Sequence, residues 1–119
     1  MNVRISRNQL RFRITQDDLA RLNSGELLEQ STVLPGNRVF QMTIHTVPDG
    51  TVPLKLDYDG QQMALAVDAH SARVLLESPP SKQGIEVMQE VQPGQALLLQ
   101  LEVDVRSRDR GKKHEPRTC

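Results

Sequence analysis

Arginines and carboxylates near the two ends of the chain have residue types that can bind phosphate and a divalent metal ion. Arg4, Arg11 and Arg13 alternate with aliphatic residues, so an extended backbone places Arg11 and Arg13 on one face. Glu102 and Asp104 also lie two residues apart and would share one face of a strand, about 7 Å from each other. Guanidinium groups bind phosphate oxygens, and paired carboxylates can hold Mg²⁺. We therefore take the three arginines as candidate anion-binding residues and the two carboxylates as candidate metal ligands.

The alternative for the same residues is a ladder of cross-strand ion pairs, each worth about 0.2–1 kcal/mol. A two-residue loop at Arg7 and Asn8 sets Arg4 directly opposite Arg11, where the two positive charges repel. Either nearby carboxylates neutralise this pair or an anion does, and the sequence leaves both open. Unpaired arginines around an open pocket would favour a ligand site.

Other residue types that often carry chemistry lack the spacing that a site requires. The three histidines are far apart in the sequence, the only cysteine is Cys119, and the glycines do not form a phosphate-binding loop. Asp68, His70 and Ser71 are types found in catalytic triads, but their adjacency in one turn does not create triad geometry. We name no catalytic residue and leave open whether the protein is an enzyme.

The elements that would position the charged residues are mostly strands. Thr15 and Asp18 form a capping pattern at the start of a short helix over residues 16–23. Period-two alternation predicts strands elsewhere, with residues 71–77 also fitting a short helix. The expected class is mainly β (α+β), an antiparallel sandwich or barrel-like sheet of about seven or eight short strands with one helix. The predicted strand segments are 3–14 (a hairpin), 28–33, 38–47, 52–67 (a hairpin), 72–77, 85–91 and 96–105.

The hairpin over residues 52–67 has the strongest turn signal in the chain, Asp59-Gly60. Treated as a two-residue turn, this dipeptide pairs Leu56 with Met63 and Leu54 with Leu65. Both pairs would face the core, together with Val52 and Val67. No internal repeat is evident along the chain.

Charge divides the chain into an acidic body and a basic tail. Residues 1–105 hold 9 basic and 13 acidic side chains (net −4), and residues 106–119 hold 6 basic and 2 acidic ones (net +4). We expect one β-rich domain over 1–105 and a flexible tail over 106–119, because the tail has no aliphatic residue to bury. The tail and the scarcity of aromatic residues do not favour nucleic-acid binding. With no apolar run of about 18 residues, we expect a cytoplasmic protein that does not enter a membrane.

The opening of the chain carries a family resemblance. Residues 1–5, Asn8 and residues 11–16 resemble the start of a small bacterial family of uncharacterised proteins, M-K-I-R-I-x-G-N-S-I-R-L-R-L-T-Q. Residues 102–105 lie where that family tends to have an E-K-D-F run. The chain departs from the pattern at Arg7, where glycine is usual. The resemblance implies a shared fold and no assigned activity.

Together these observations predict an uncharacterised, non-catalytic binding or assembly module with unknown partners and no cofactor. The alternative is a metal-assisted binder or hydrolase of a phosphate-bearing small molecule, which would use Mg²⁺ and water as the nucleophile. A homodimer through an uncovered sheet edge is a further alternative.

Overall fold

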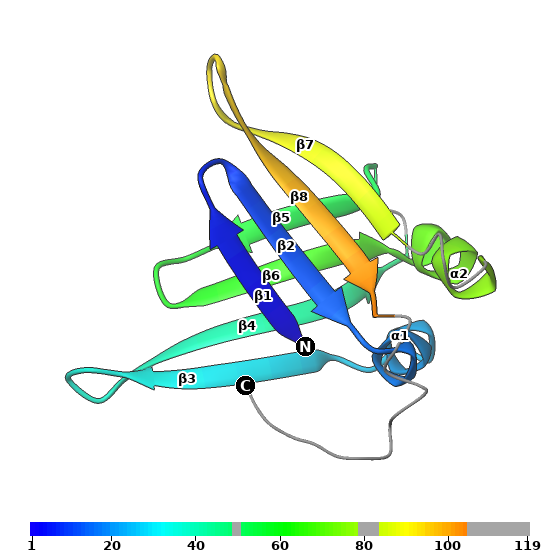
Figure 1. Cartoon of the computed structure of the whole chain (residues 1–119), viewed down its shortest axis with the longest axis horizontal. Coiled ribbons are helices and arrows are strands. Elements are labelled where there is room, and N and C mark those ends of the chain that lie inside the picture. Colours follow the sequence, from blue (N-terminus) through cyan, green and yellow to red (C-terminus); the bar gives the residue numbers. More distant parts are fainter. Residues whose placement is uncertain (49–50, 79–83, 105–119) are drawn as a thin grey trace.

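Two four-stranded sheets and two helices make up the described part of the protein (Figure 1). The computed structural model describes residues 1–48, 51–78 and 84–104. The predicted tail over 106–119 therefore lies outside the described residues. Sheet A has the strand order β1-β2-β8-β7, and sheet B has the order β3-β4-β6-β5. The elements are β1 (Asn2–Ser6), β2 (Gln9–Ile14), α1 (Gln16–Asn23), β3 (Leu28–Leu34), β4 (Arg38–Val47), β5 (Leu54–Tyr58), β6 (Gln62–Asp68), α2 (Ala69–Glu77), β7 (Gly84–Gln92) and β8 (Gln95–Val103).

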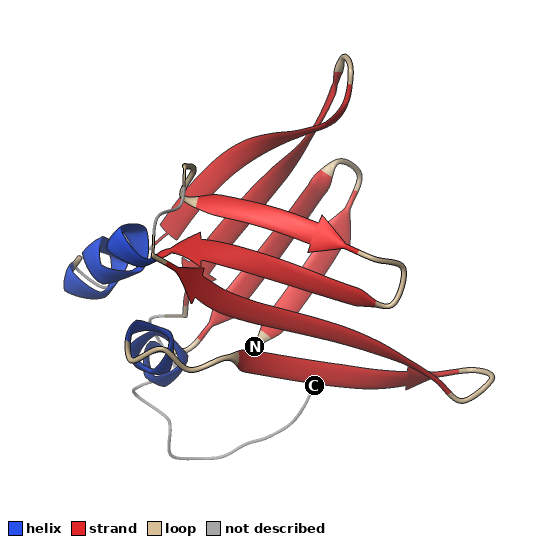
Figure 2. Ribbon diagram, turned by 180° about the vertical axis from the view of Figure 1, so that it is seen from behind, coloured by secondary structure: helices blue, strands red, loops and turns tan. Residues whose placement is uncertain are grey.

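The two sheets cross each other obliquely, and both helices lie at one end of the crossing (Figures 1 and 2). The predicted mainly β class is confirmed, but the sheets do not close into a barrel. Alternating aliphatic residues from both sheets meet in one core with the buried faces of the helices. Burial of this apolar surface is the main driving force for folding. The largest fully buried side chains are Phe12, Ile14, Leu19, Leu22, Ile44, Leu54, Leu65, Val67, Leu99 and Leu101.

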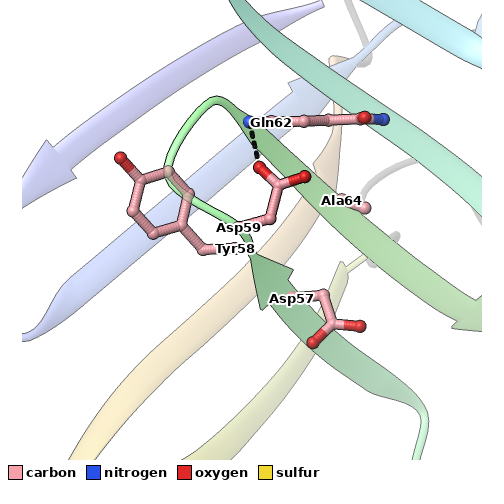
Figure 3. Close-up of a pocket in the computed structure, with 5 residues that line it drawn as sticks. All are labelled: Asp57, Tyr58, Asp59, Gln62 and Ala64. Atoms are coloured by element: carbon pink, nitrogen blue, oxygen red, sulfur yellow. Dashed lines mark hydrogen bonds between the residues drawn. The ribbon is translucent and has the colours of Figure 1, made fainter.

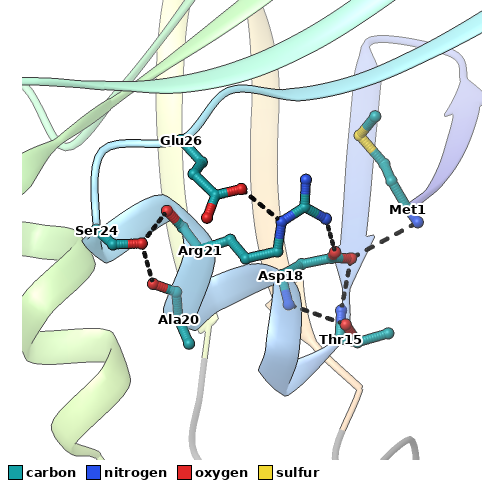
Figure 4. A network of polar contacts seen from close by, with 7 residues as sticks. All are labelled: Met1, Thr15, Asp18, Ala20, Arg21, Ser24 and Glu26. Atoms are coloured by element: carbon teal, nitrogen blue, oxygen red, sulfur yellow. Dashed lines mark hydrogen bonds and ion pairs between the residues drawn. The ribbon is translucent and has the colours of Figure 1, made fainter.

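Helix α1 confirms the predicted helix over residues 16–23, including its cap (Figure 4). The Thr15 hydroxyl accepts a hydrogen bond from the Asp18 backbone N–H at 3.0 Å, and the Asp18 carboxylate accepts one from the Thr15 N–H at 3.2 Å. This reciprocal pair satisfies two backbone donors that the first turn of a helix leaves without partners. The capping signal is local, which is why the sequence alone located this helix.

Helix α2 corrects the strand predicted over residues 72–77. Asp68 caps this helix by accepting the Ser71 N–H at 3.2 Å, and Ala72 and Leu75 are buried. A short apolar run fits either a strand or a helix by its period alone. Packing decides here, because α2 lies against α1 at the end of the sheets.

The register of the β5–β6 hairpin also differs from the prediction. Leu56 pairs with Leu65, not Met63, and Leu54 pairs with Val67. The Asp59 N–H donates to the Gln62 carbonyl at 3.2 Å, so the two central residues of the turn are Gly60 and Gln61 instead of Asp59 and Gly60. The Asp59 carboxylate accepts the backbone N–H groups of Gln61 at 2.9 Å and of Gln62 at 2.7 Å, and Figure 3 shows the bond to Gln62. These backbone hydrogen bonds lower the pKa of Asp59.

The chain repeats one arrangement twice: hairpin, helix, hairpin. The strands β1 to β4 with α1 form the first unit, and β5 to β8 with α2 form the second. In each sheet a hairpin from one unit pairs with a hairpin from the other, so the central pairs β2–β8 and β4–β6 are parallel. Phe12 and Leu65 occupy equivalent positions, as do the caps Thr15 and Asp68. This duplicated topology and its parallel strand pairs were not predicted from the sequence.

The first hairpin and the end of strand β8 position the candidate site residues in sheet A. The register of the first hairpin is confirmed, with Arg4 opposite Arg11 and Val3 opposite Phe12. Strand β8 ends at Val103, two residues before the predicted end, so Asp104 follows the strand. Neither helix in the described part of the chain is long and apolar enough to cross a membrane.

Candidate anion-binding face of sheet A

The outer face of sheet A brings four of the five candidate site residues into two rows across the strands. Parallel pairing of β2 with β8 sets Arg11 beside Gln100 and Arg13 beside Glu102. The first hairpin and the last strand are therefore neighbours, through β2. In strand order β1, β2, β8, β7, one row is Asn2, Arg13, Glu102 and Gly84, and the other is Arg4, Arg11, Gln100 and Glu86.

A single carboxylate, that of Glu102, lies against two of the arginines. Its oxygens are 3.7 Å from Nε of Arg11 and 3.6 Å from Nη2 of Arg13. These separations are ion-pair distances and are longer than good N–H···O hydrogen bonds. All three side chains are partly exposed, so each pair contributes little stability.

Two groups on this face lack a hydrogen-bond partner among the described residues. The side chain of Arg4 makes no ion pair or hydrogen bond there, although it lies opposite the charged Arg11. The Nε atom of Arg11 is buried and donates no hydrogen bond within the described chain. A buried donor without an acceptor costs free energy, and so do facing like charges. An acceptor anion between Arg4 and Arg11 would remove both costs.

Glutamines and a second carboxylate complete this face, and the sequence reasoning missed them. The Gln9 amide donates to Gln100, and the Gln100 amide donates to Glu86 at 2.6 Å. Gln100 is buried by its neighbours although it points away from the core. Strand parity could have found these residues. Gln9 lies two residues from Arg11 and Gln100 lies two residues from Glu102, so each shares a face with that charged residue.

The two predicted metal ligands line different depressions. Glu102 lines a depression of about 400 Å³ with Gly84, Ile85, Glu86 and Gln100. Asp104 lines another of about 410 Å³, together with Arg13 and residues at the starts of β1 and α1. Among the described residues no group of three or more His, Cys, Asp or Glu side chains could hold a metal ion. The assignment of Glu102 and Asp104 as metal ligands stays a prediction.

Charge on this face is divided between its two halves. Strands β1 and β2 contribute Arg4, Arg11 and Arg13, and strands β7 and β8 contribute Glu86 and Glu102. Among the described residues, Arg11 and Arg13 share one carboxylate and Arg4 pairs with none, so the β1–β2 half carries an excess of positive charge. We call this half, defined by the three arginines, the arginine strip.

The fold and this face define a small α+β domain of two crossed sheets whose charged residues lie outside the core. Within that class, the chain belongs to a family of unknown function, DUF7009, whose model matches residues 1–117. This result confirms the resemblance to an uncharacterised domain family. No curated protein and no solved structure matches the chain.

Proposed function

We propose that the protein is a non-catalytic binding module whose arginine strip holds an anionic group, such as a phosphate, of its ligand. The observation that carries this proposal is the arginine excess, with Glu102 shared by two guanidinium groups and no carboxylate of the described residues paired with Arg4. Arg4 and Arg11 face each other across two strands, so their side chains can converge on one anion. Such charge-assisted contacts supply most of the affinity at phosphate sites.

The experiment is a titration with phosphate, pyrophosphate and triphosphate, followed by amide chemical shifts and melting temperature. Loss of a charge-assisted hydrogen bond costs about 1.5–3 kcal/mol, so Arg4→Gln should weaken binding at least about ten-fold. Arg38→Gln is the matched control, because it removes the same charge at the exposed tip of the β3–β4 hairpin. Equal losses in the two variants, or no binding by the wild type, would contradict the proposal.

The Glu102→Gln variant separates this proposal from a metal-assisted phosphate binder or hydrolase. Glu102 competes with the anion for the arginines, so its neutralisation should tighten anion binding, by about five-fold from Coulomb's law at a few ångströms. If Glu102 held Mg²⁺, the same variant would instead weaken binding and abolish its dependence on Mg²⁺. Tighter, metal-independent binding supports the binding module, whereas the opposite result supports the metal-assisted reading.

A further inference from the structure

The edge strands β5 and β1 occupy equivalent positions in the duplicated topology, but the two places where they approach the other sheet, here called seams, differ. At one seam, the Gln89 side chain on β7 bridges to the backbone of β5. Its amide oxygen accepts the Leu56 N–H at 2.8 Å, and its amide nitrogen donates to the Leu56 carbonyl at 3.0 Å. A side chain thus satisfies the outward-pointing backbone groups of an edge strand. Strand β5 also packs against β7 and β8 there.

At the other seam, the residue equivalent to Leu56 is Val3 on β1. Ser6 and Gln9 flank the two-residue loop and exchange backbone hydrogen bonds. Alternation then directs the N–H and C=O groups of Val3 and Ile5 away from β2. No described residue bonds to these groups, and the Ile5 side chain is 64% exposed. The β1 edge is therefore available for pairing with another strand.

Other edges in the described chain carry features that discourage pairing. Strand β7 has an irregular register between Glu90 and Gln92, and β5 is bridged by Gln89. Strand β3 turns Gln30 and Thr32 toward the core side, so self-pairing would not create a continuous apolar row. Strand β1 has a regular register, and its core-side residues Val3 and Ile5 are apolar, as is Met1 directly before the strand.

We propose that β1 pairs antiparallel with β1 of a second copy of this chain, centred on Val3. In this register Val3 faces Val3 of the second copy, and Ile5 faces Met1 of the second copy. Arg4 then faces Asn2 of the second copy, which avoids the direct repulsion of two Arg4 side chains. The strand is thus self-complementary on both faces. Pairing would cover exposed Ile5 and join the two A sheets into one.

Amide hydrogen exchange on the wild-type protein tests the pairing directly. The Val3 and Ile5 amides should exchange at least about ten-fold more slowly as the protein concentration rises from about 10 μM to 1 mM. The Arg4 amide is an internal reference, because it pairs with Arg11 within one copy and should be protected at every concentration. Val3 and Ile5 exchange rates that do not depend on concentration would overturn the proposal.

Substitutions at the edge provide the second readout, by sedimentation velocity. Val3→Pro removes only an outward-pointing N–H, so the hairpin should persist while the dimer dissociates. Val3→Thr keeps the N–H and the β-branched shape, and should remain dimeric. Ile5→Lys changes an exposed side chain and should also yield monomers. A monomeric wild type, or a dimer that persists in Val3→Pro, would refute pairing through β1.

This inference goes beyond the proposed anion site and does not depend on it. Arg4→Gln should weaken anion binding at least about ten-fold but leave the β1 backbone edge, and hence the dimer, intact. Val3→Pro should dissociate the dimer but leave anion binding unchanged. Failure of either proposal can therefore be recognised separately.

Discussion

Replacing Gln89 by methionine isolates the contribution of the amide bridge between the sheets. Methionine keeps the length of the side chain but removes the hydrogen bonds of 2.8 and 3.0 Å to Leu56. Each bond contributes a net value of about 0.5–1.5 kcal/mol, so the free energy of unfolding should fall by about 1–3 kcal/mol. For a domain of this size, the melting temperature should fall by about 4–12 °C.

Thermal and urea denaturation measure this loss. Gln92→Met is the matched control on the same strand, because the Gln92 amide makes an exposed hydrogen bond to Gln95. The free energy of unfolding of Gln92→Met should stay within about 0.5 kcal/mol of the wild-type value. Equal effects of the two substitutions would refute the assignment of the bridge as a stabilising contact.

The Gln89→Glu variant adds a test with a defined pH dependence. A carboxylate keeps the acceptor for the Leu56 N–H but repels the Leu56 carbonyl oxygen, so folding should raise the pKa of the introduced acid above its unfolded value of about 4.3. A raised folded pKa means that stability is greatest below the unfolded pKa and is lost as the pH rises through the folded value. The difference from wild type in melting temperature should therefore shrink as the pH falls. A difference that grows toward acid pH would contradict the bridge geometry.

Three further predictions concern the elements around the site. Thr15→Ala removes the cap of α1 and should lower the free energy of unfolding, measured by urea denaturation, by about 0.5–2 kcal/mol. Thr15→Ser keeps the capping hydroxyl and should lose much less stability. Leu65→Ala, at a fully buried position, should cost about 2–5 kcal/mol, whereas Val33→Ala, at a 68% exposed position, should change stability by less than about 0.5 kcal/mol. Because backbone N–H groups lower the pKa of Asp59, its contribution to stability is present above the unfolded pKa and is lost as the pH falls through the folded value. Asp59→Ala should reduce the loss of melting temperature at acid pH. An unchanged dependence of the melting temperature on acid pH would contradict this role of Asp59.

Sequence reasoning succeeded where one short segment contains the whole cause of a structure. The first hairpin follows from a two-residue loop and strict alternation, so the pairs Arg4–Arg11 and Val3–Phe12 were predictable. Helix α1 follows from Thr15 and Asp18, whose side chains cap one turn. In these cases the interactions that fix the conformation join residues only a few positions apart.

Sequence reasoning failed where local signals were compatible with two structures. Residues 72–77 fit either a strand or a helix, and packing of α2 against α1 decided between them. Asp59-Gly60 fits the centre of a two-residue turn, but the Asp59 carboxylate organises a turn centred one residue later, on Gly60 and Gln61. The difference moved the β5–β6 register by two residues and kept the same side chains facing the core.

For the candidate site, the sequence by itself determined which residues are charged and which faces of their strands they share. Only the tertiary structure decided that β2, and not β1, lies beside β8. That choice placed Glu102 between Arg11 and Arg13, left Arg4 without an ion pair in the described chain, and separated Glu102 from Asp104 into different depressions. The physical reason is that strand alternation is a property of the local backbone, whereas the pairing of strands about ninety residues apart is selected by burial of a core common to both sheets.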